Sequence, residues 1–191
     1  RIERLFWNNL TRKIHTDDTR VPVILPGAGK TKTGYFWAYC GDDQHRYSVY
    51  DFTLSHCRDG PAWWLRGYRG YLQADAYGGY DGIAIQSEGR VILVSCGAHI
   101  RRRFFTQRTL APEVACAALA WFRRLYQWER QWKDFADDQR YALRQEHAVP
   151  LLAQFHEWLV RTEPHLLPKS KIGEAVSYAL HQWESWSRYC E

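Results

Sequence analysis

The feature that most constrains the fold is a change of pattern near residue 97. Before it, short segments rich in β-branched and aromatic residues alternate with Gly and Pro, which is typical of strands joined by turns. After it, large apolar residues recur three or four positions apart, which is typical of amphipathic helices. The 191 residues are enough for one domain, or for one domain with a helical addition. The sequence therefore predicts strands first and helices second.

The N-terminal half predicts five strands and one short helix. The strands are Lys13–Leu25, Gly34–Cys40, Arg46–Thr53, Gly70–Asp75 and Arg90–Cys96. The turns Pro26–Gly29 and Gly41–Asp43 separate the first three strands, which favours an antiparallel meander. The short helix is Pro61–Gly67, because Pro is favoured in a first helical turn.

The C-terminal half predicts helices with aromatic residues in their core. Pro112 begins a long helix, a second helix follows around Phe155, and Ser170 is a candidate N-cap for a third. The residues expected on the buried faces are Ala118, Trp121, Leu125, Trp128, Trp132, Leu151, Leu152, Phe155, Trp158, Leu159, Ile172, Val176, Ala179, Trp183 and Trp186.

Charge and cysteine content limit the partners and the compartment. A formal net charge of +5 and a pI near 9.0 are compatible with a polyanionic partner such as DNA. Five scattered cysteines without a Cys-x-x-Cys pair favour a reducing, cytoplasmic compartment. No stretch is apolar enough to span a membrane, and no signal peptide is expected. Because the sequence begins with Arg1 and contains no Met, we expect it to be part of a longer reading frame.

Two adjacent aspartates, Asp17 and Asp18, lie in the first predicted strand. Aspartate is a poor strand former, so the pair is either a metal-binding feature of the sheet or a loop that ends just before Val21. The pattern alone favours the loop. Successive strand residues face opposite sides, so only one of the two carboxylates can face a given site.

Asp75 ends the fourth predicted strand and is followed by Gly78 and Gly79. A carboxylate held by a rigid strand, next to glycines that leave room for a substrate backbone, suits a metal site. The alternative is a turn residue, which the pattern alone again favours. Magnesium binds through one or two carboxylates and a substrate phosphate, so Asp17 and Asp75 would have to act together.

Basic residues in two places are candidate DNA contacts. Arg101, Arg102 and Arg103 could neutralise phosphates, or they could form a solvated helical face. Lys30 and Lys32 lie at a predicted hairpin tip, where they are DNA contacts or plain turn residues. The same turn is not a nucleotide-binding loop, because the required first glycine of that pattern is absent.

Cys96 and His99 have the spacing of half a zinc site. The second half is not obvious, since His56 and Cys57 form the one other close pair of these residue types. A structural role is therefore favoured over a zinc ion, and the spacing leaves metal binding open.

Four ordered blocks of the sequence resemble the insertion-sequence-66 family of bacterial transposases. They run over almost the whole chain: His15–Gly34, Tyr68–Tyr80, Cys96–Phe105, and Leu167–Ser170 followed by Tyr178–Leu180 and Trp183. Asp18 stands where that family usually has Glu, and Gly97 stands where it usually has Trp.

The resemblance implies an α/β fold: a ribonuclease H-like mixed sheet, with three antiparallel strands then two more, and a C-terminal all-helical insertion. The same element order is visible in the pattern. The catalytic core is expected over residues 1–105 and the helical insertion over residues 106–191. In this family an Asp, Asp, Glu triad holds Mg²⁺ (or Mn²⁺). By position, Asp17 matches the first carboxylate and Asp75 the second, and we expect the chain to end before the third.

The function implied by the resemblance is metal-dependent DNA cleavage and strand transfer at insertion-sequence ends. Because the third carboxylate is expected to be missing, the sequence leaves open whether this chain is itself an enzyme. The alternatives are a non-enzymatic DNA- or protein-binding remnant of a transposase, and a stand-alone metal-dependent nuclease. DNA is the implied partner, and joining two DNA ends implies a homo-oligomer.

Overall fold

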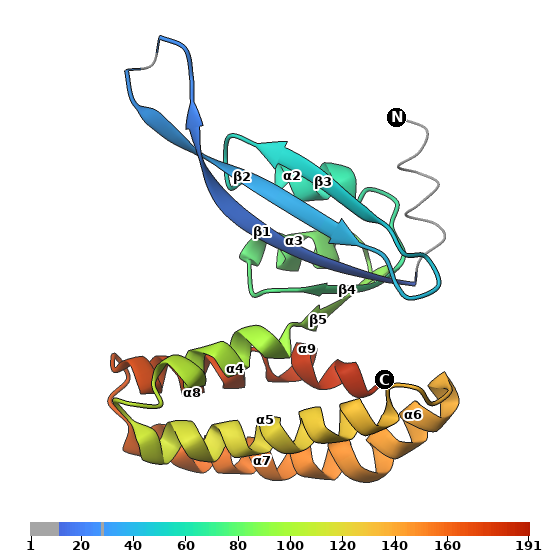
Figure 1. Ribbon diagram of the computed structural model, residues 1–191, viewed down its shortest axis with the longest axis vertical. Coiled ribbons are helices and arrows are strands. Elements are labelled where there is room, and N and C mark those ends of the chain that lie inside the picture. Colours follow the sequence, from blue (N-terminus) through green and yellow to red (C-terminus); the bar gives the residue numbers. More distant parts are fainter. Residues whose placement is uncertain (1–11, 28) are drawn as a thin grey trace. The chain divides into compact units, whose positions relative to one another are not determined.

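The computed structural model describes residues 12–27 and 29–191. The N-terminus, where no signal peptide is expected, and Ala28 of the first turn lie outside the described residues. The chain divides into two compact units, one ending at Ser95 and one running over Cys96–Glu191 (Figure 1). The boundary expected from the sequence, between residues 105 and 106, falls inside helix α4 (Gly97–Thr106).

The first unit is built on a five-stranded mixed sheet. Its strands are β1 (Lys13–Ile24), β2 (Thr31–Cys40), β3 (Ser48–Thr53), β4 (Gly70–Ala74) and β5 (Val91–Ser95). Their order in the sheet is β3-β2-β1-β4-β5. The first three strands pair antiparallel, whereas β1 pairs parallel with β4, and β4 parallel with β5. The prediction of an antiparallel meander followed by two further strands is confirmed, and β1 lies at the centre.

The far half of the β1–β2 hairpin extends beyond this sheet as a two-stranded ribbon (Figure 1). In β2, β3 pairs only with Tyr35–Cys40, and in β1, β4 pairs only with Lys13–His15. Within the described residues, 21–24 and 31–34 therefore pair with each other alone. Ile24 near the tip is 85% exposed.

Two helices connect the later strands. Helix α2 (Asp59–Trp64) overlaps the predicted helix Pro61–Gly67, but it begins two residues earlier and ends three residues earlier. Helix α3 (Gly78–Gln86) was not predicted, because three glycines in its first turns give a weak helical signal. It forms because Tyr80 and Ile83, three positions apart, are buried against the sheet.

The core of this unit lies on one face of the sheet. In β1, Ile14 and Thr16 are buried, and the in-register partner of Thr16 on β2 is buried Tyr39. The Tyr39 ring stacks on Trp64 of α2 with a centroid distance of 3.8 Å and an interplanar angle of 7°. The adjacent Trp63 is half exposed, so of these two tryptophans only Trp64 belongs to the core.

The second unit is all-helical. Its helices are α4, α5 (Pro112–Trp132), α6 (Asp137–Leu143), α7 (Val149–Thr162), α8 (Lys171–His181) and α9 (Trp183–Ser187). A π-helical segment, Arg144–Ala148, joins α6 to α7. Short 3₁₀ helices follow α7 at Glu163–His165 and α9 at Arg188–Cys190. The hydroxyl oxygen of Ser170 accepts the N–H of Gly173, so Ser170 caps α8 as predicted. None of the described helices is long and apolar enough to span a membrane.

Aromatic rings form the centre of the helical core. Phe155 is fully buried, and its ring centroid lies 5.5 Å from that of Trp121 and 5.7 Å from that of Phe122. Trp183 and Trp186 approach the same ring edge-on. A Cβ added to Gly97 would lie 2.6 Å from the indole nitrogen of Trp186, so that indole fills the space beside this glycine.

We expect Phe155→Ala to lower the free energy of unfolding of the helical unit by about 3–5 kcal/mol, because it leaves a cavity in a close-packed core. Val160→Ala on the same helix is the control, since Val160 is about half exposed; its expected effect is within about 0.5 kcal/mol. Urea denaturation followed by circular dichroism measures both. Equal effects would contradict the position given to Phe155.

Candidate functional site

Asp17 and Asp18 lie in β1 and face opposite sides of the sheet. Asp18 shares the helix-covered face with Thr16, and its side chain is 11% exposed. Its Oδ2 lies 3.1 Å from Nε2 of His56. Asp17 is exposed on the other face, and its Oδ1 accepts the N–H of Asp18 at 3.0 Å. The two neighbouring carboxylates therefore have separate environments.

His56 is held by aromatic rings. It stacks on Tyr35 and Trp37, with centroid distances of 4.4 Å and 5.3 Å, and also contacts the ring of Tyr77. The Tyr77 hydroxyl donates to the backbone carbonyl of His56 at 2.7 Å. This arrangement fixes the imidazole beside Asp18. The sequence pattern does not predict this contact, because it singles out His56 only as the neighbour of Cys57.

Asp75 follows directly after β4, and its Oδ1 accepts the N–H of Tyr77 at 3.1 Å. The parallel register pairs Lys13 with Tyr71 and His15 with Gln73. Continued by two residues, this register brings Asp75 level with Asp17. Neighbouring strands lie about 4.8 Å apart, and level residues of parallel strands face the same side. By this extrapolated register, Asp17 and Asp75 would share the face of the sheet opposite the helices.

Tyr80 of α3 lies on the helix-covered face of the sheet, against Thr16 of β1. Its hydroxyl is 3.0 Å from Oγ1 of Thr16, and both residues are buried. Burial raises the pKa of Tyr80 well above its usual range, and the negative charges of Asp18, Asp75 and Asp17 raise it further, against the lowering effect of the Thr16 hydrogen bond. The three carboxylates and the buried Tyr80 hydroxyl therefore influence one another electrostatically.

These residues could contribute to a metal site but do not complete one. Two strand-held carboxylates on one face match the number that Mg²⁺ uses when substrate phosphate and water supply the other ligands. Within residues 12–27 and 29–191, no group of three or more His, Cys, Asp or Glu side chains converges to hold a metal ion. The same holds for Cys96 and His99 in the first turn of α4, which find no further ligands there.

The basic residues singled out in the sequence lie in different places. Lys32 pairs with Val23 in the ribbon, and Lys30 lies in the turn. Val23 is six residues from Asp17, or about 20 Å along the strand. Within α4, Arg103 stacks on the ring of Tyr178 at 3.8 Å, whereas Arg101 lies near Phe105 and Tyr126. The arginine run therefore does not form one continuous surface.

Comparison with known proteins identifies the family. Residues 8–191 match the Transposase IS66 family, so the chain belongs to that family. It is 29% identical to two uncharacterized proteins of Sinorhizobium fredii, y4hP and y4qI, and each match covers 93% of this chain. A third uncharacterized protein of that species, y4jD, is 26% identical over 94% of the chain. The chain spans a little over a third of the length of these relatives, at 35–37%.

The two aspartates are expected to differ in their effect on stability. Asp18→Ala removes a largely buried carboxylate whose Oδ2 lies 3.1 Å from His56 Nε2, and should lower the free energy of unfolding by about 1 kcal/mol. Asp17→Ala alters an exposed side chain and should change the free energy of unfolding by about 0.5 kcal/mol or less. Urea denaturation of both variants tests this order. The reverse order would show that the faces of β1 are assigned wrongly.

Proposed function

We propose that the chain contributes part of the catalytic core of a DNA transposase, in which Asp17 and Asp75 bind Mg²⁺ or Mn²⁺ for DNA cleavage and strand transfer. The observation that carries this proposal is the parallel pairing of β1 with β4 up to His15 and Gln73, a register that would bring Asp75 level with Asp17 if continued by two residues. Membership of a transposase family supports the DNA substrate and the use of a divalent metal.

The sheet supports a ribonuclease H-like assignment for this core. In that fold, the catalytic carboxylates lie on the first strand, at the end of the fourth, and on a helix after the fifth. Here β1 is central and β4 is its parallel neighbour, and we assign Asp17 in β1 and Asp75 after β4 to the first two of those positions. A homo-oligomer is part of the proposal, because strand transfer joins two DNA ends.

The chain's own residues would position the reaction in two ways. β1 and β4 hold the Asp17 and Asp75 carboxylates at fixed spacing, and the N–H of Tyr77 orients Asp75 through its Oδ1. A bound divalent metal supplies charge that offsets the negative phosphodiester and activates the attacking oxygen. The Asp18–His56 pair lies on the other face of β1, so we assign it to the support of the strand.

Metal binding tests the assignment of the two aspartates. We expect Asp17→Asn and Asp75→Asn each to weaken Mn²⁺ binding by about tenfold or more, because each removes a charged ligand. Asp81→Asn, an exposed carboxylate on α3, is the control and should bind as the unchanged protein does. Isothermal titration measures the affinities. Unchanged binding by Asp75→Asn would refute the metal assignment.

Catalysis by this chain alone is expected to be weak. Among the described residues no group of three or more possible metal ligands is found, so we expect little or no joining of element ends to target DNA. A strand-transfer assay with labelled element ends and Mg²⁺ measures this. Robust joining that Asp17→Ala abolishes would contradict the prediction, because two carboxylates would then be sufficient for strand transfer.

A binding role without catalysis is the second candidate. The lack of a third convergent carboxylate among the described residues favours it over a stand-alone nuclease. In that case Asp17→Asn would leave DNA binding unchanged, and no cleavage would be observed with either metal.

A further inference from the structure

The positive charge of the chain is concentrated in α4, α5 and the turn between them. The segment Gly97–Trp132 contains seven arginines and two glutamates, and no lysine or aspartate. Its net charge of +5 equals that of the whole chain. The remaining residues are neutral on balance, so any electrostatic attraction of a polyanion centres on this helix pair.

Four of these arginines line a groove between α4 and α5, which run side by side (Figure 1). Its volume is about 400 Å³. On each helix the lining residues recur at spacings of three, four or seven, so they share one helical face. The lining is Arg101, Phe105 and Arg108 from α4 and the following turn, and Cys116, Leu119, Arg123, Tyr126 and Arg130 from α5.

Aromatic rings hold two of the guanidinium groups. Arg101 lies 5.4 Å from the ring centroid of Phe105 and 5.9 Å from that of Tyr126. Arg108 lies 3.9 Å from the Phe105 centroid, and its Nη1 donates to the backbone carbonyl of Phe105 at 2.8 Å. Cation–π contacts restrain the side chain without neutralising its charge.

No acidic side chain is among the described residues that line the groove. One of the two glutamates of the segment, Glu129, forms a two-bonded ion pair with Arg144 through distances of 2.7 Å and 2.8 Å. The arginines of the groove are therefore not balanced by carboxylates within it.

The geometry points to this groove as a binding site for the phosphate backbone of DNA. Planar guanidinium groups bind phosphate oxygens in pairs, which favours arginine over a point charge. Arg123 and Arg130 are seven residues apart, or about 10 Å along α5, which matches about three base-pair steps of a duplex. This inference rests on the proposed function only in naming DNA as the polyanion.

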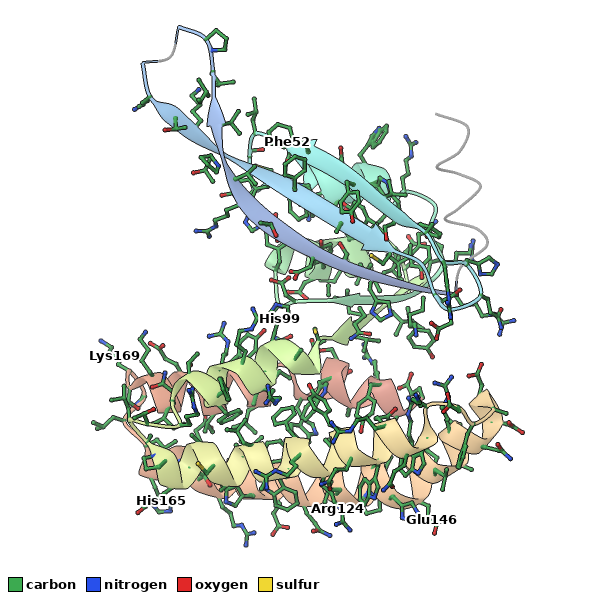
Figure 2. The ribbon with its side chains drawn as sticks, viewed as in Figure 1. Phe52, His99, Arg124, Glu146, His165 and Lys169 are labelled. Carbon is green, nitrogen blue, oxygen red and sulfur yellow. The ribbon has the colours of Figure 1, made fainter. Side chains whose placement is uncertain are left out.

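The groove differs from the basic run singled out in the sequence. Of that run, only Arg101 lines it, while Arg103 is stacked on Tyr178. Arg124, labelled in Figure 2, also lies outside the groove, since its guanidinium packs over Trp128 at 5.0 Å. The contacts that matter come from two helices and are separated by up to 29 positions in the sequence.

Paired charge-removal variants of the full chain test the site. Arg123→Gln with Arg130→Gln removes two positive charges from the groove, and both side chains are exposed, so folding should be kept. Arg161→Gln with Lys169→Gln removes two from exposed positions elsewhere in the same unit (Lys169 is labelled in Figure 2). Binding of a fluorescent DNA duplex is measured by anisotropy in EDTA, so that the metal site makes no contribution.

We expect the groove variant to bind on the order of tenfold more weakly near 0.15 M salt. Its slope of log affinity against log salt should fall by about 2, because two phosphate contacts are lost. In the control variant, both the affinity and the salt slope should change much less than in the groove variant. Equal losses in the two variants would overturn the proposal, because only net charge would then matter.

Cys116 reports on occupancy directly, because it is exposed and lines the groove. DNA should slow its alkylation by a maleimide in the unchanged protein and in the control variant, but not in the groove variant. Alkylation that DNA does not slow would overturn the proposal. Slow alkylation without DNA would also overturn it, because a protein segment or a second copy would then cover the groove.

These outcomes are separable from failure of the proposed function. Loss of metal binding in Asp75→Asn concerns the sheet, whereas a loss of DNA affinity in the groove variant, measured in EDTA, concerns the helical unit. A groove that binds DNA in a protein whose aspartates bind no metal would support the second candidate function.

Discussion

The hydrogen-bonded pairing of β1 with β4 is the constraint on which the candidate site depends. It pairs β4 with the first residues of β1, up to His15 and Gln73, a register that would bring Asp75 level with Asp17 if continued by two residues. Buried Ile14 and Thr16 fix this register. A slip of one residue would turn both out of the core and turn the neighbouring polar residues of β1 into it. The hydroxyl of Tyr80 on Thr16 adds a second restraint from α3. The core thus determines which aspartate faces outward.

Sequence patterns predicted the elements well and the contacts between them poorly. All five strands, α2 and the three long helices follow from periodicity and turn residues, which are local properties. Helix α3 was missed because its glycines mask a helix that tertiary burial stabilises. Asp17 and Asp75 were chosen by resemblance, since each alone suits a turn. Tyr80 and His56 could not be found, because their contacts with β1 join residues far apart in the sequence.

The same distinction separates the basic run from the groove. A cluster of adjacent arginines is visible in any sequence, but consecutive helical residues point in different directions. Packing of α4 on α5 selects Arg101 from the run and adds Arg108, Arg123 and Arg130 from other turns. Charge therefore predicts that a polyanion is attracted, whereas only the packed helices define where its phosphates would lie.

The two-stranded ribbon carries a consequence for how copies of this chain behave in concentrated solution. Both of its outer edges lack a neighbouring strand within the described residues, and such edges recruit strands from other molecules. Pro22 lacks an N–H for continuing a ladder, and Lys30 and Lys32 place like charges at the tip. Exposed Ile24 acts in the opposite sense, because it offers apolar surface to another chain. The ribbon therefore combines unpaired strand edges, which favour association, with side chains that oppose strand pairing between molecules. Neutralising the two lysines should favour fibrous or amorphous association over the dispersed protein.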